Sequence, residues 1–476
     1  MTEQAGASDA GPLFPEATDT KAALRAALLQ GPIIGTIARL SLPTIGVFAA
    51  QALGDTANTY YASRLGTDAL IGVSVVFPIW MLMTMMYSGG LGGAVAAAVA
   101  RAIGAERDRD ADDHVLHAII LGIVMGALFM VIVWRFGPFV FANMGATGAA
   151  LDQALSFSFW IFLSAIPLWI ASLCSAALRG AGDVRTPALL VLGAALVLVV
   201  VAPVPVLGLG GFPRLGVVGT GVVTVLYWTG ATIWLLIHLG SGRAVVRLRW
   251  SRLRWTLFWE VLKVGLPTSL GAVLLNGSIV LITGAMGTLG AAELAGYSLG
   301  ARLDYVVIPV LFGLGTSVLI LVGACVGAGD IDRAKRVTLY GSVIAAGAVG
   351  LVGLVVTLRP SLWIGIFSQE PSVLATATIY LGMAGPVYGT LGVIFVLNFA
   401  AQGAGRPVWT TLAEVARLVI AGGLGWIAIE RFGADMAGLS RIVAIANVSA
   451  ALICVMAFWT GLVWPRQSEA RPFAKT

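Results

Sequence analysis

The sequence predicts an all-α polytopic membrane protein, with twelve transmembrane helices arranged as two six-helix lobes. Two observations predict this class: the composition suits a lipid environment, and the second half of the chain repeats the first. Of the 476 residues, 58% are hydrophobic and only 11% are charged, and the mean hydropathy is +0.94. Soluble domains carry about 25% charged residues. Burial in an ordinary core does not explain so large a deficit, and we expect the chain to cross a membrane many times.

Twelve segments are long and apolar enough to cross a bilayer, which takes about 20 helical residues. Short polar loops separate them, and the second and eighth are the longest. The expected spans are 37–62, 69–100, 115–136, 154–178, 187–208, 217–240, 261–284, 293–325, 337–358, 373–401, 409–429 and 440–464.

The remaining segments divide the chain into lobes, linker and tails. Residues 1–36 are expected to form a polar tail without a cleavable signal peptide, including a weakly amphipathic surface helix at "KAALRAALLQ". The N-lobe is predicted over 37–240 and the C-lobe over 258–464. A basic linker at 241–257 joins them, and residues 465–476 form a second tail.

Basic residues predict the orientation of the spans. The N-terminus and the loops after even-numbered spans carry 22 of the 29 Lys and Arg residues, counting Arg417 as near that side, whereas the other side carries six. By the positive-inside rule, both termini should be cytoplasmic, in a multi-pass protein of the inner membrane. The net charge of +6 therefore reflects topology, and no nucleic-acid partner is expected.

The two halves of the chain resemble each other at an almost constant offset. Four short sequences recur 223 or 224 residues later: "LPT" at 42 and 266, "LGTDALIGVS" at 65 and "LGAAELAGYS" at 289, "IGA" at 103 and "VGA" at 326, and "RGAG" at 179 and "QGAG" at 402. Gly89 and Gly313 share the offset. Six spans return the chain to its starting side, so the halves should be related by a pseudo-twofold axis along the membrane normal.

Three segments of the chain resemble one family, the multidrug and toxic compound extrusion (MATE) transporters. "ALRGAGDVRTP" at 177–187 is similar to their turn between the fourth and fifth helices. The segment 300–334 resembles their eighth helix and the following loop, particularly in the bacterial DinF-like branch, and "LPT…YYASRLGTDAL" resembles their first helix. The likeness covers about residues 37–464.

The resemblance implies a V-shaped pair of lobes around a central cleft. It also implies antiport: amphipathic, often cationic, organic compounds leave the cell as protons or sodium ions enter, and the lobes rock to give alternating access. The turn at 177–187 lacks the GxxxxGK[ST] spacing of a phosphate-binding loop. Arg179 and Arg185 are expected to anchor this turn at lipid headgroups.

Asp55 is the candidate cation-coupling residue. An ionisable group inside a span is costly and is by default a functional candidate. Asn58 lies one turn on, and the two residues look exchanged relative to the usual family pattern. Burial disfavours the charged form of a carboxyl group, so Asp55 is a suitable proton carrier. A structural hydrogen-bond pair between helices is the alternative.

The fifth span lacks the second carboxylate that DinF-like members often have, because Leu198 and Ala202 stand at the matching positions. Thr224 in the sixth span matches a family threonine at this site. One carboxylate with a few neutral oxygens favours H+ over Na+ as the coupling ion. No other cofactor and no metal site are expected.

Four charged residues in the C-lobe spans could form one polar network. Arg302 and Asp304 are two apart and do not face each other on a helix, whereas Glu414 and Arg417 are three apart and can pair. Arg302 and Arg417 match family arginines. Asn276 stands where members of another branch have a carboxylate, which argues against the sodium site of that branch. Structural support and gating or coupling remain the two interpretations.

The segment "FPIWMLMTMMY" at 77–87 is the candidate substrate wall. Methionine adapts to varied shapes, and aromatic rings attract organic cations. The candidates are Trp80, Met83 and Tyr87, with Tyr61 and Tyr305 from neighbouring spans. Packing against lipid or other helices is the alternative.

The remaining residues do not indicate an enzyme, because no GxSxG, HExxH or Walker motif is present. The single cysteines are expected to be buried thiols, and His114 and His117 to be solvated loop residues. The predicted function is export of small organic molecules by a monomer. A lipid-linked substrate flippase and a membrane sensor or assembly subunit are the alternatives.

Overall fold

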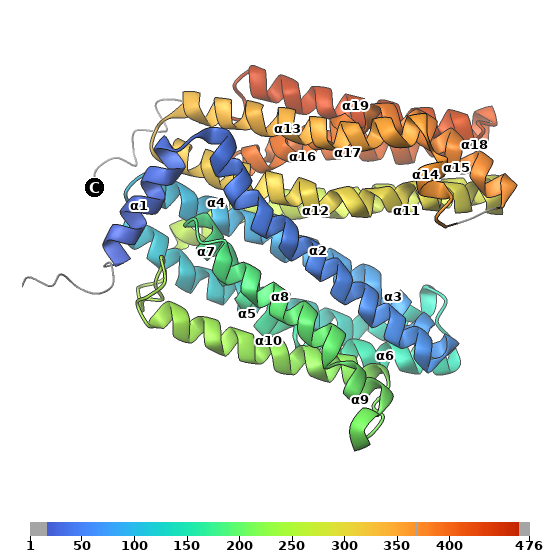
Figure 1. Ribbon diagram of the computed structural model, residues 1–476, viewed down its shortest axis with the longest axis horizontal. Helices are drawn as coiled ribbons and strands as arrows, with labels where there is room; N and C mark the ends of the chain where they lie inside the picture. The colour runs from blue at the N-terminus through green and yellow to red at the C-terminus, as the bar shows by residue number, and fades with distance from the viewer. Residues whose placement is uncertain (1–16, 368–369, 466–476) are drawn as a thin grey trace, which may run out of the picture.

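The computed structural model describes residues 17–367 and 370–465, apart from the side chains of 17–20 and Tyr305. Every regular element in this part of the chain is a helix (Figure 1). Eleven spans are long and apolar enough to cross a membrane, and one further pair of helices is bent by 44°. Counting that pair as one span gives the twelve that the sequence predicts.

The first half contains a short surface helix and six spans. The surface helix is α1 (Ala17–Gln30), and the spans follow in chain order. They are α2 (Ile33–Leu65); α3 (Thr67–Met85) continued by the π-helical η1 (Met86–Gly90) and α4 (Leu91–Gly104); α5 (Asp108–Asn143); α6 (Gly148–Leu163) with α7 (Ala165–Gly180); α8 (Arg185–Val200) with α9 (Pro203–Leu207), followed by the short η2 (Leu209–Gly211); and α10 (Val217–Gly240).

The second half repeats this arrangement after a linker. Its spans are α11 (Trp255–Leu289); α12 (Ala291–Gly327); α13 (Ile331–Leu358), followed by the short α14 (Ser361–Ile364); α15 (Pro371–Ala384) with η3 (Gly385–Val387) and α16 (Tyr388–Gly403); α17 (Val408–Leu418) with the π-helical η4 (Val419–Leu424) and α18 (Gly425–Phe432); and α19 (Met436–Trp459).

Prolines account for two of the breaks within spans. Pro167 lacks the N–H that would bond to the carbonyl of Leu163, which is where α6 ends and the 44° bend begins. Pro203 likewise leaves the carbonyl of Val199 without its helical donor. The hydroxyl of Tyr61 donates to that oxygen at 2.7 Å. Tyr61 therefore stabilises the break between α8 and α9.

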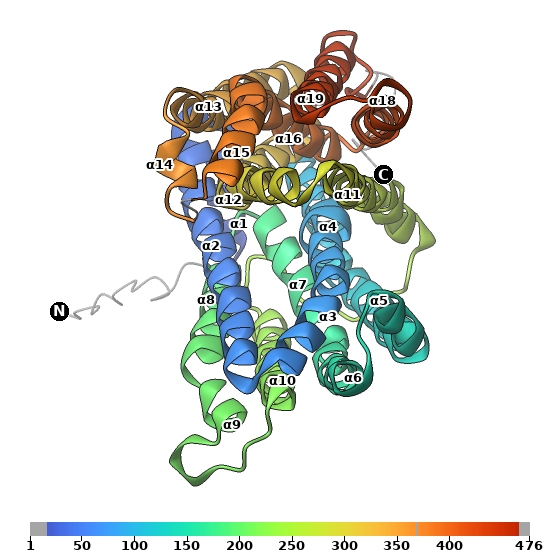
Figure 2. The same ribbon diagram turned by 90° about the vertical axis from the view of Figure 1, so that its right-hand side faces the viewer.

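The two halves form two lobes that meet at one end and diverge towards the other (Figures 1 and 2). The end where they meet carries α1 and residues 241–254, and we name it the linker end. The opposite end, with the turns at Gly66 and Gly290, is the open end. The fold is the V-shaped pair of six-helix lobes that the sequence predicts.

The lobes cross where α4 of the N-lobe packs against α12 of the C-lobe. A Cβ atom on Gly104 would lie 2.0 Å from the carbonyl oxygen of Ala324, and one on Gly327 would lie 2.1 Å from that of Arg101. The repeat offset of 223 relates Gly104 to Gly327 and Arg101 to Ala324, so the second contact repeats the first. The two backbones therefore touch symmetrically, and the pseudo-twofold axis passes through this crossing.

The repeated RGAG and QGAG sequences form equivalent turns at the linker end. Gly182 and Gly405 adopt left-handed backbone angles, with φ of +93° and +79°, which glycine alone takes without strain. The N–H of each donates to a carbonyl three residues earlier, at 2.9 Å in both turns. The phosphate-loop geometry is absent, and the turns simply reverse the chain between spans.

The surface helix α1 bridges the two lobes at the linker end. Lys21 near its start forms an ion pair of 2.9 Å with Asp112 on α5 of the N-lobe. At its other end, Arg333 on α13 of the C-lobe donates to the carbonyl of Gly31 at 2.5 Å. Because each end of α1 binds a different lobe, this helix lies across their junction.

The linker covers His114 and His117, which were expected from the sequence to be exposed to solvent. Arg254 binds Asp110 and Asp113 on α5, at 2.6 and 2.8 Å, and the hydrogen bond to Asp110 holds the pKa of Arg254 above its usual value. His117 is fully buried: its Nδ1 donates to the Asp113 carbonyl and its Nε2 accepts from the Arg254 N–H. His114 is buried beside it. The prediction of solvated histidines was wrong because the linker folds back over α5.

Candidate functional site

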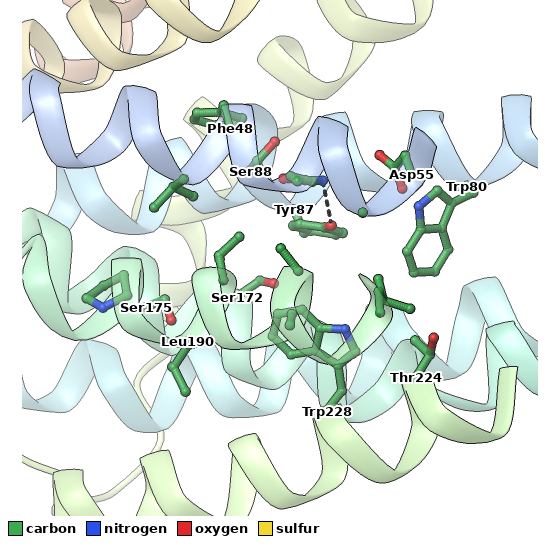
Figure 3. Close-up of a pocket in the computed structure, with 18 of the residues that line it drawn as sticks. Phe48, Asp55, Trp80, Tyr87, Ser88, Ser172, Ser175, Leu190, Thr224 and Trp228 are labelled. Atoms are coloured by element: carbon green, nitrogen blue, oxygen red, sulfur yellow. Dashed lines mark hydrogen bonds between the residues drawn. The ribbon is translucent and has the colours of Figure 1, made fainter. Parts of the chain in front are cut away.

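A cavity lies inside the N-lobe, between α2, α3, α7, α8 and α10 (Figure 3). Its volume is about 110 Å³. A single water needs roughly 10–15 Å³ of such space, so the cavity has room for several waters or part of an organic molecule. Its lining includes all three residues predicted to couple the cation: Asp55, Asn58 and Thr224.

Asp55 projects from α2 into this cavity beside the indole of Trp80 (Figure 3). It is the only carboxylate among the described residues that line the cavity, and no basic side chain pairs with it there. Asn58 lines the cavity one helical turn further along α2. The arrangement gives a carboxylate that lines the cavity and has no basic ion-pair partner among the described residues.

The neutral oxygens around Asp55 are few. The hydroxyl of Thr224 donates to the Thr220 carbonyl at 2.8 Å, so it has only lone pairs to offer the cavity. The wall that α8 contributes is apolar and consists of Pro187, Leu190, Val191, Ala194, Ala195 and Leu198. Leu198 and Ala202 stand at the positions that match the second carboxylate of DinF-like members. Leu198 lines the cavity, whereas Ala202 is buried in a separate cluster with Tyr61.

Aromatic side chains form the middle of the cavity. Trp80, Tyr87 and Trp228 line it from three directions (Figure 3). The hydroxyl of Tyr87 donates to Thr84 Oγ1 at 3.3 Å and accepts from the amide of Gln51 at 3.5 Å. The sequence singled out Trp80 and Tyr87 but gave no reason to select Trp228 or Gln51.

The other predicted wall residues lie elsewhere. Met83 is completely buried in the hydrophobic core, and Tyr61 stabilises the break after α8; neither lines the cavity. The side chain of Tyr305 lies outside the described part of the structure. The helix α3 therefore presents Trp80 to the cavity and packs Met83 against its neighbours.

Arg179, expected at lipid headgroups, lines the cavity at its linker end. It is the only basic residue among the described lining residues. Gly180, the next residue, packs so tightly on α4 that a Cβ would lie 2.3 Å from the Ala96 carbonyl oxygen. This contact draws the end of α7 into the lobe, which keeps Arg179 away from the lipid surface.

Three charged residues of the C-lobe spans lie near one another, because Arg417 interacts electrostatically with both Glu414 and Asp304. Asp304 accepts a hydrogen bond of 2.8 Å from the hydroxyl of Tyr388, and Arg302 lies over the ring of Phe367 at 5.6 Å. Arg417 lies 3.7 Å from Glu414, the partner that the sequence spacing allows, and it donates to Asn447 at 2.8 Å. Asn447, Tyr388 and Phe367 are uncharged and therefore did not stand out in the sequence.

A second cavity, of about 60 Å³, lies between the lobes and is lined by Glu414, Gln402, Asn398 and Thr268. Glu414 Oε2 and Gln402 Oε1 are buried without a hydrogen bond. Asn276 lies nearby on α11 and donates to the sulfur of Met85 in the other lobe at 2.9 Å. No group of three metal-binding side chains occurs in the described ranges.

The lobes are tied together at the linker end by Arg101 on α4. Its Nε and one terminal nitrogen donate to Glu260 Oε1 on α11, at 3.3 and 3.1 Å. Its other terminal nitrogen donates to the carbonyls of Gln402 and Gly403 on α16. His114 lies 3.7 Å from the second oxygen of Glu260. These contacts close the linker end while the open end stays apart.

Known proteins share both this sequence pattern and this fold. The MatE family model matches the chain twice, over residues 43–204 and 267–427, once in each half. A protein named "FAD transporter" from Shewanella oneidensis is 25% identical over 436 residues, covering 90% of this chain and 95% of its own. A probable multidrug resistance protein NorM from Thermotoga maritima is 24% identical over 396 residues, covering 80% and 84%.

Solved structures support the same assignment of fold. A MOP superfamily transporter from Pyrococcus furiosus superposes with a TM-score of 0.83 at 22% identity, covering 95% of this chain and 99% of its own. The Vibrio cholerae MATE transporter VcmN in its bent form gives a TM-score of 0.80 at 17% identity, covering 94% and 100%. The match of the family model in both halves shows that the chain belongs to the MatE family, the multidrug and toxic compound extrusion transporters.

Proposed function

We propose that this protein is a secondary active antiporter that exports amphipathic organic compounds in exchange for protons. The observation that carries the proposal is Asp55, a carboxylate without a basic partner in a cavity of the N-lobe. A group of this kind inside a membrane span is costly to keep, which is why it marks an ion or substrate path.

The arrangement of the lobes supports alternating access. They are tied by Arg101 at the linker end and diverge at the open end. The linker end carries the arginine-rich segment 241–254, so the positive-inside rule supports placing it in the cytoplasm. In this orientation the protein is outward-facing, and export requires the contacts of Arg101 to break and re-form in each cycle.

The surroundings of Asp55 support H+ rather than Na+ as the coupling ion. Sodium needs several oxygen ligands at once, whereas a proton needs one carboxylate. The apolar wall of α8 offers no oxygen side chain, and the hydroxyl hydrogen of Thr224 is already committed to its own helix. Only Asp55 and Asn58 remain as strong ligands at this end of the cavity.

The same surroundings support substrates with an apolar body. The indole of Trp80 lies beside Asp55, and Tyr87 and Trp228 continue the aromatic lining. An organic cation would be attracted by both the carboxylate and the ring faces. The names of two relatives, a FAD transporter and a probable multidrug resistance protein, support organic compounds as substrates.

Transport in proteoliposomes tests the proposal. Ethidium, a planar organic cation, is the probe, and a proton or a sodium gradient is imposed separately. We expect the proton gradient alone to drive ethidium movement, and Asp55→Asn to abolish it. Asp68→Asn, which alters an exposed carboxylate at the start of α3, is the matched control and should transport normally. Movement that persists in Asp55→Asn, or that only a sodium gradient drives, would refute proton coupling through Asp55.

A further inference from the structure

Arg179 lies in the last turn of α7 and lines the N-lobe cavity. No hydrogen bond or ion pair engages it among the residues that the structure describes. The nearest acid along the chain, Asp183, is already occupied. Its Oδ1 accepts from the N–H groups of Arg185 and Thr186, and its Oδ2 accepts from the Thr186 hydroxyl at 2.7 Å.

The charge of Arg179 is not needed to build the turn that follows it. The equivalent position in the C-lobe is Gln402, and the QGAG turn has the same hydrogen bonds and the same left-handed glycine as the RGAG turn. Both residues also line a cavity, Arg179 the one in the N-lobe and Gln402 the one between the lobes. A neutral side chain thus supports the same architecture, and the positive charge at Arg179 requires another explanation.

Two hydroxyls share the face of α7 that carries Arg179. Ser172, Ser175 and Arg179 are spaced by three and four residues, which places them in one row along the helix. All three line the cavity, and Figure 3 shows both serines at the side away from Asp55. Neither serine hydroxyl has a hydrogen bond within the described structure. The row therefore offers one fixed positive charge and two free donors to the cavity.

We propose that Arg179, with Ser172 and Ser175, binds an anionic group of the transported molecule, such as a carboxylate, sulfonate or phosphate. This inference rests on the proposed export function and adds a chemical class to its substrates. A guanidinium forms paired hydrogen bonds with such groups, and these bonds are strongest away from bulk water. With Asp55 at the other end and Trp228 between, the cavity fits amphiphiles that are anionic or zwitterionic, in addition to organic cations.

Equilibrium binding of two matched probes tests the inference. Dansylglycine carries a carboxylate, whereas dansylglycinamide has the same ring and size without the charge. Binding is followed by energy transfer from tryptophan to dansyl, using the purified full chain in phosphatidylcholine nanodiscs, so that no anionic lipid competes. The wild type is expected to bind dansylglycine about tenfold more tightly than the amide, because one charged hydrogen-bonding partner is gained.

Arg179→Gln installs the residue that the C-lobe has at this position, so the turn should still fold. We expect this variant to lose the preference for dansylglycine while keeping the wild-type affinity for the amide. Arg179→Lys should retain part of the preference. Arg185→Gln removes an exposed arginine of the same turn and should behave as the wild type.

Equal affinity of the wild type for both probes would overturn the inference. An equal loss of affinity for both probes in Arg179→Gln would also overturn it. The measurement needs no ion gradient and is therefore independent of coupling. Preferential binding of dansylglycine by a protein that fails to transport would refute the export function and leave the anion site intact. Transport of ethidium without any preference between the dansyl probes would refute the anion site and leave the export function intact.

Discussion

Replacing Glu260 by Gln should shift the protein towards the state that is open at the linker end. Glu260 on α11 is the acceptor for two N–H groups of Arg101 on α4, and so joins the two lobes. The side chains are only 10% and 17% exposed, so water screens this pair weakly. Gln keeps the shape and an acceptor oxygen but removes the charge.

The size of the shift follows from the change in hydrogen-bond type. A hydrogen bond to a charged group stabilises by about 1.5–3 kcal/mol, and a neutral one by about 0.5–1.5 kcal/mol. The difference of about 1–1.5 kcal/mol exists only while the lobes touch, and each 1.36 kcal/mol changes an equilibrium about tenfold. The open-to-closed ratio at the linker end should therefore rise about 5- to 13-fold. Arg101→Gln, which also removes the donors to the α16 carbonyls, should shift it further.

Distances between spin labels at the open end measure this ratio. Thr67→Cys and Ala291→Cys label exposed, repeat-related positions at the tips of the two lobes, and the three native cysteines are buried. Opening the linker end should bring the tips together and enlarge the short-distance population. Asp332→Asn, an exposed acid on α13 at the same end, is the control. If both Glu260→Gln and Arg101→Gln gave the wild-type distribution, the contact would not hold the lobes in this state.

Two further changes probe the packing of the lobes. Gly104→Ala should lower the free energy of unfolding by about 1–3 kcal/mol, because its Cβ would press on the Ala324 carbonyl of the other lobe; Gly347→Ala, where the space is open, should be neutral or slightly stabilising. Thermal unfolding in detergent checks both, and an equal effect of the two would contradict the close crossing. Tyr388→Phe should cost about 1.5–3 kcal/mol, because Asp304 loses its 2.8 Å donor; an unchanged midpoint would show that this bond does not stabilise the C-lobe.

The repeat could be recognised from sequence because glycine is required at special backbone positions. Gly182 and Gly405 need left-handed angles, and Gly104 and Gly327 need room for another backbone. Such requirements act on single residues and persist in both halves. Hydropathy likewise identified the spans, because each must match the bilayer thickness whatever its neighbours are.

The cavity could be predicted only in part, because its lining depends on how each helix is rotated. Asp55 stood out as an acid in an apolar span, and it does face the cavity. Trp80 and Met83 lie three residues apart on one helix, yet one lines the cavity and the other is fully buried. Arg179 was expected at the surface because a basic residue at a turn usually is. The packing of Gly180 on α4, which reverses that expectation, is a tertiary contact.

The crossing of α4 and α12 lies at one end of a long helix, so a rotation there moves the far end of that helix a long way. Gly327 is the last of the 37 residues of α12, and the crossing therefore lies at one extremity of a helix about 55 Å long. A tilt of about 10° around that point would carry Ala291, at the far tip, through about 10 Å. Atoms beside the crossing would scarcely move. A small rotation at the linker end is thus converted into a large displacement at the open end.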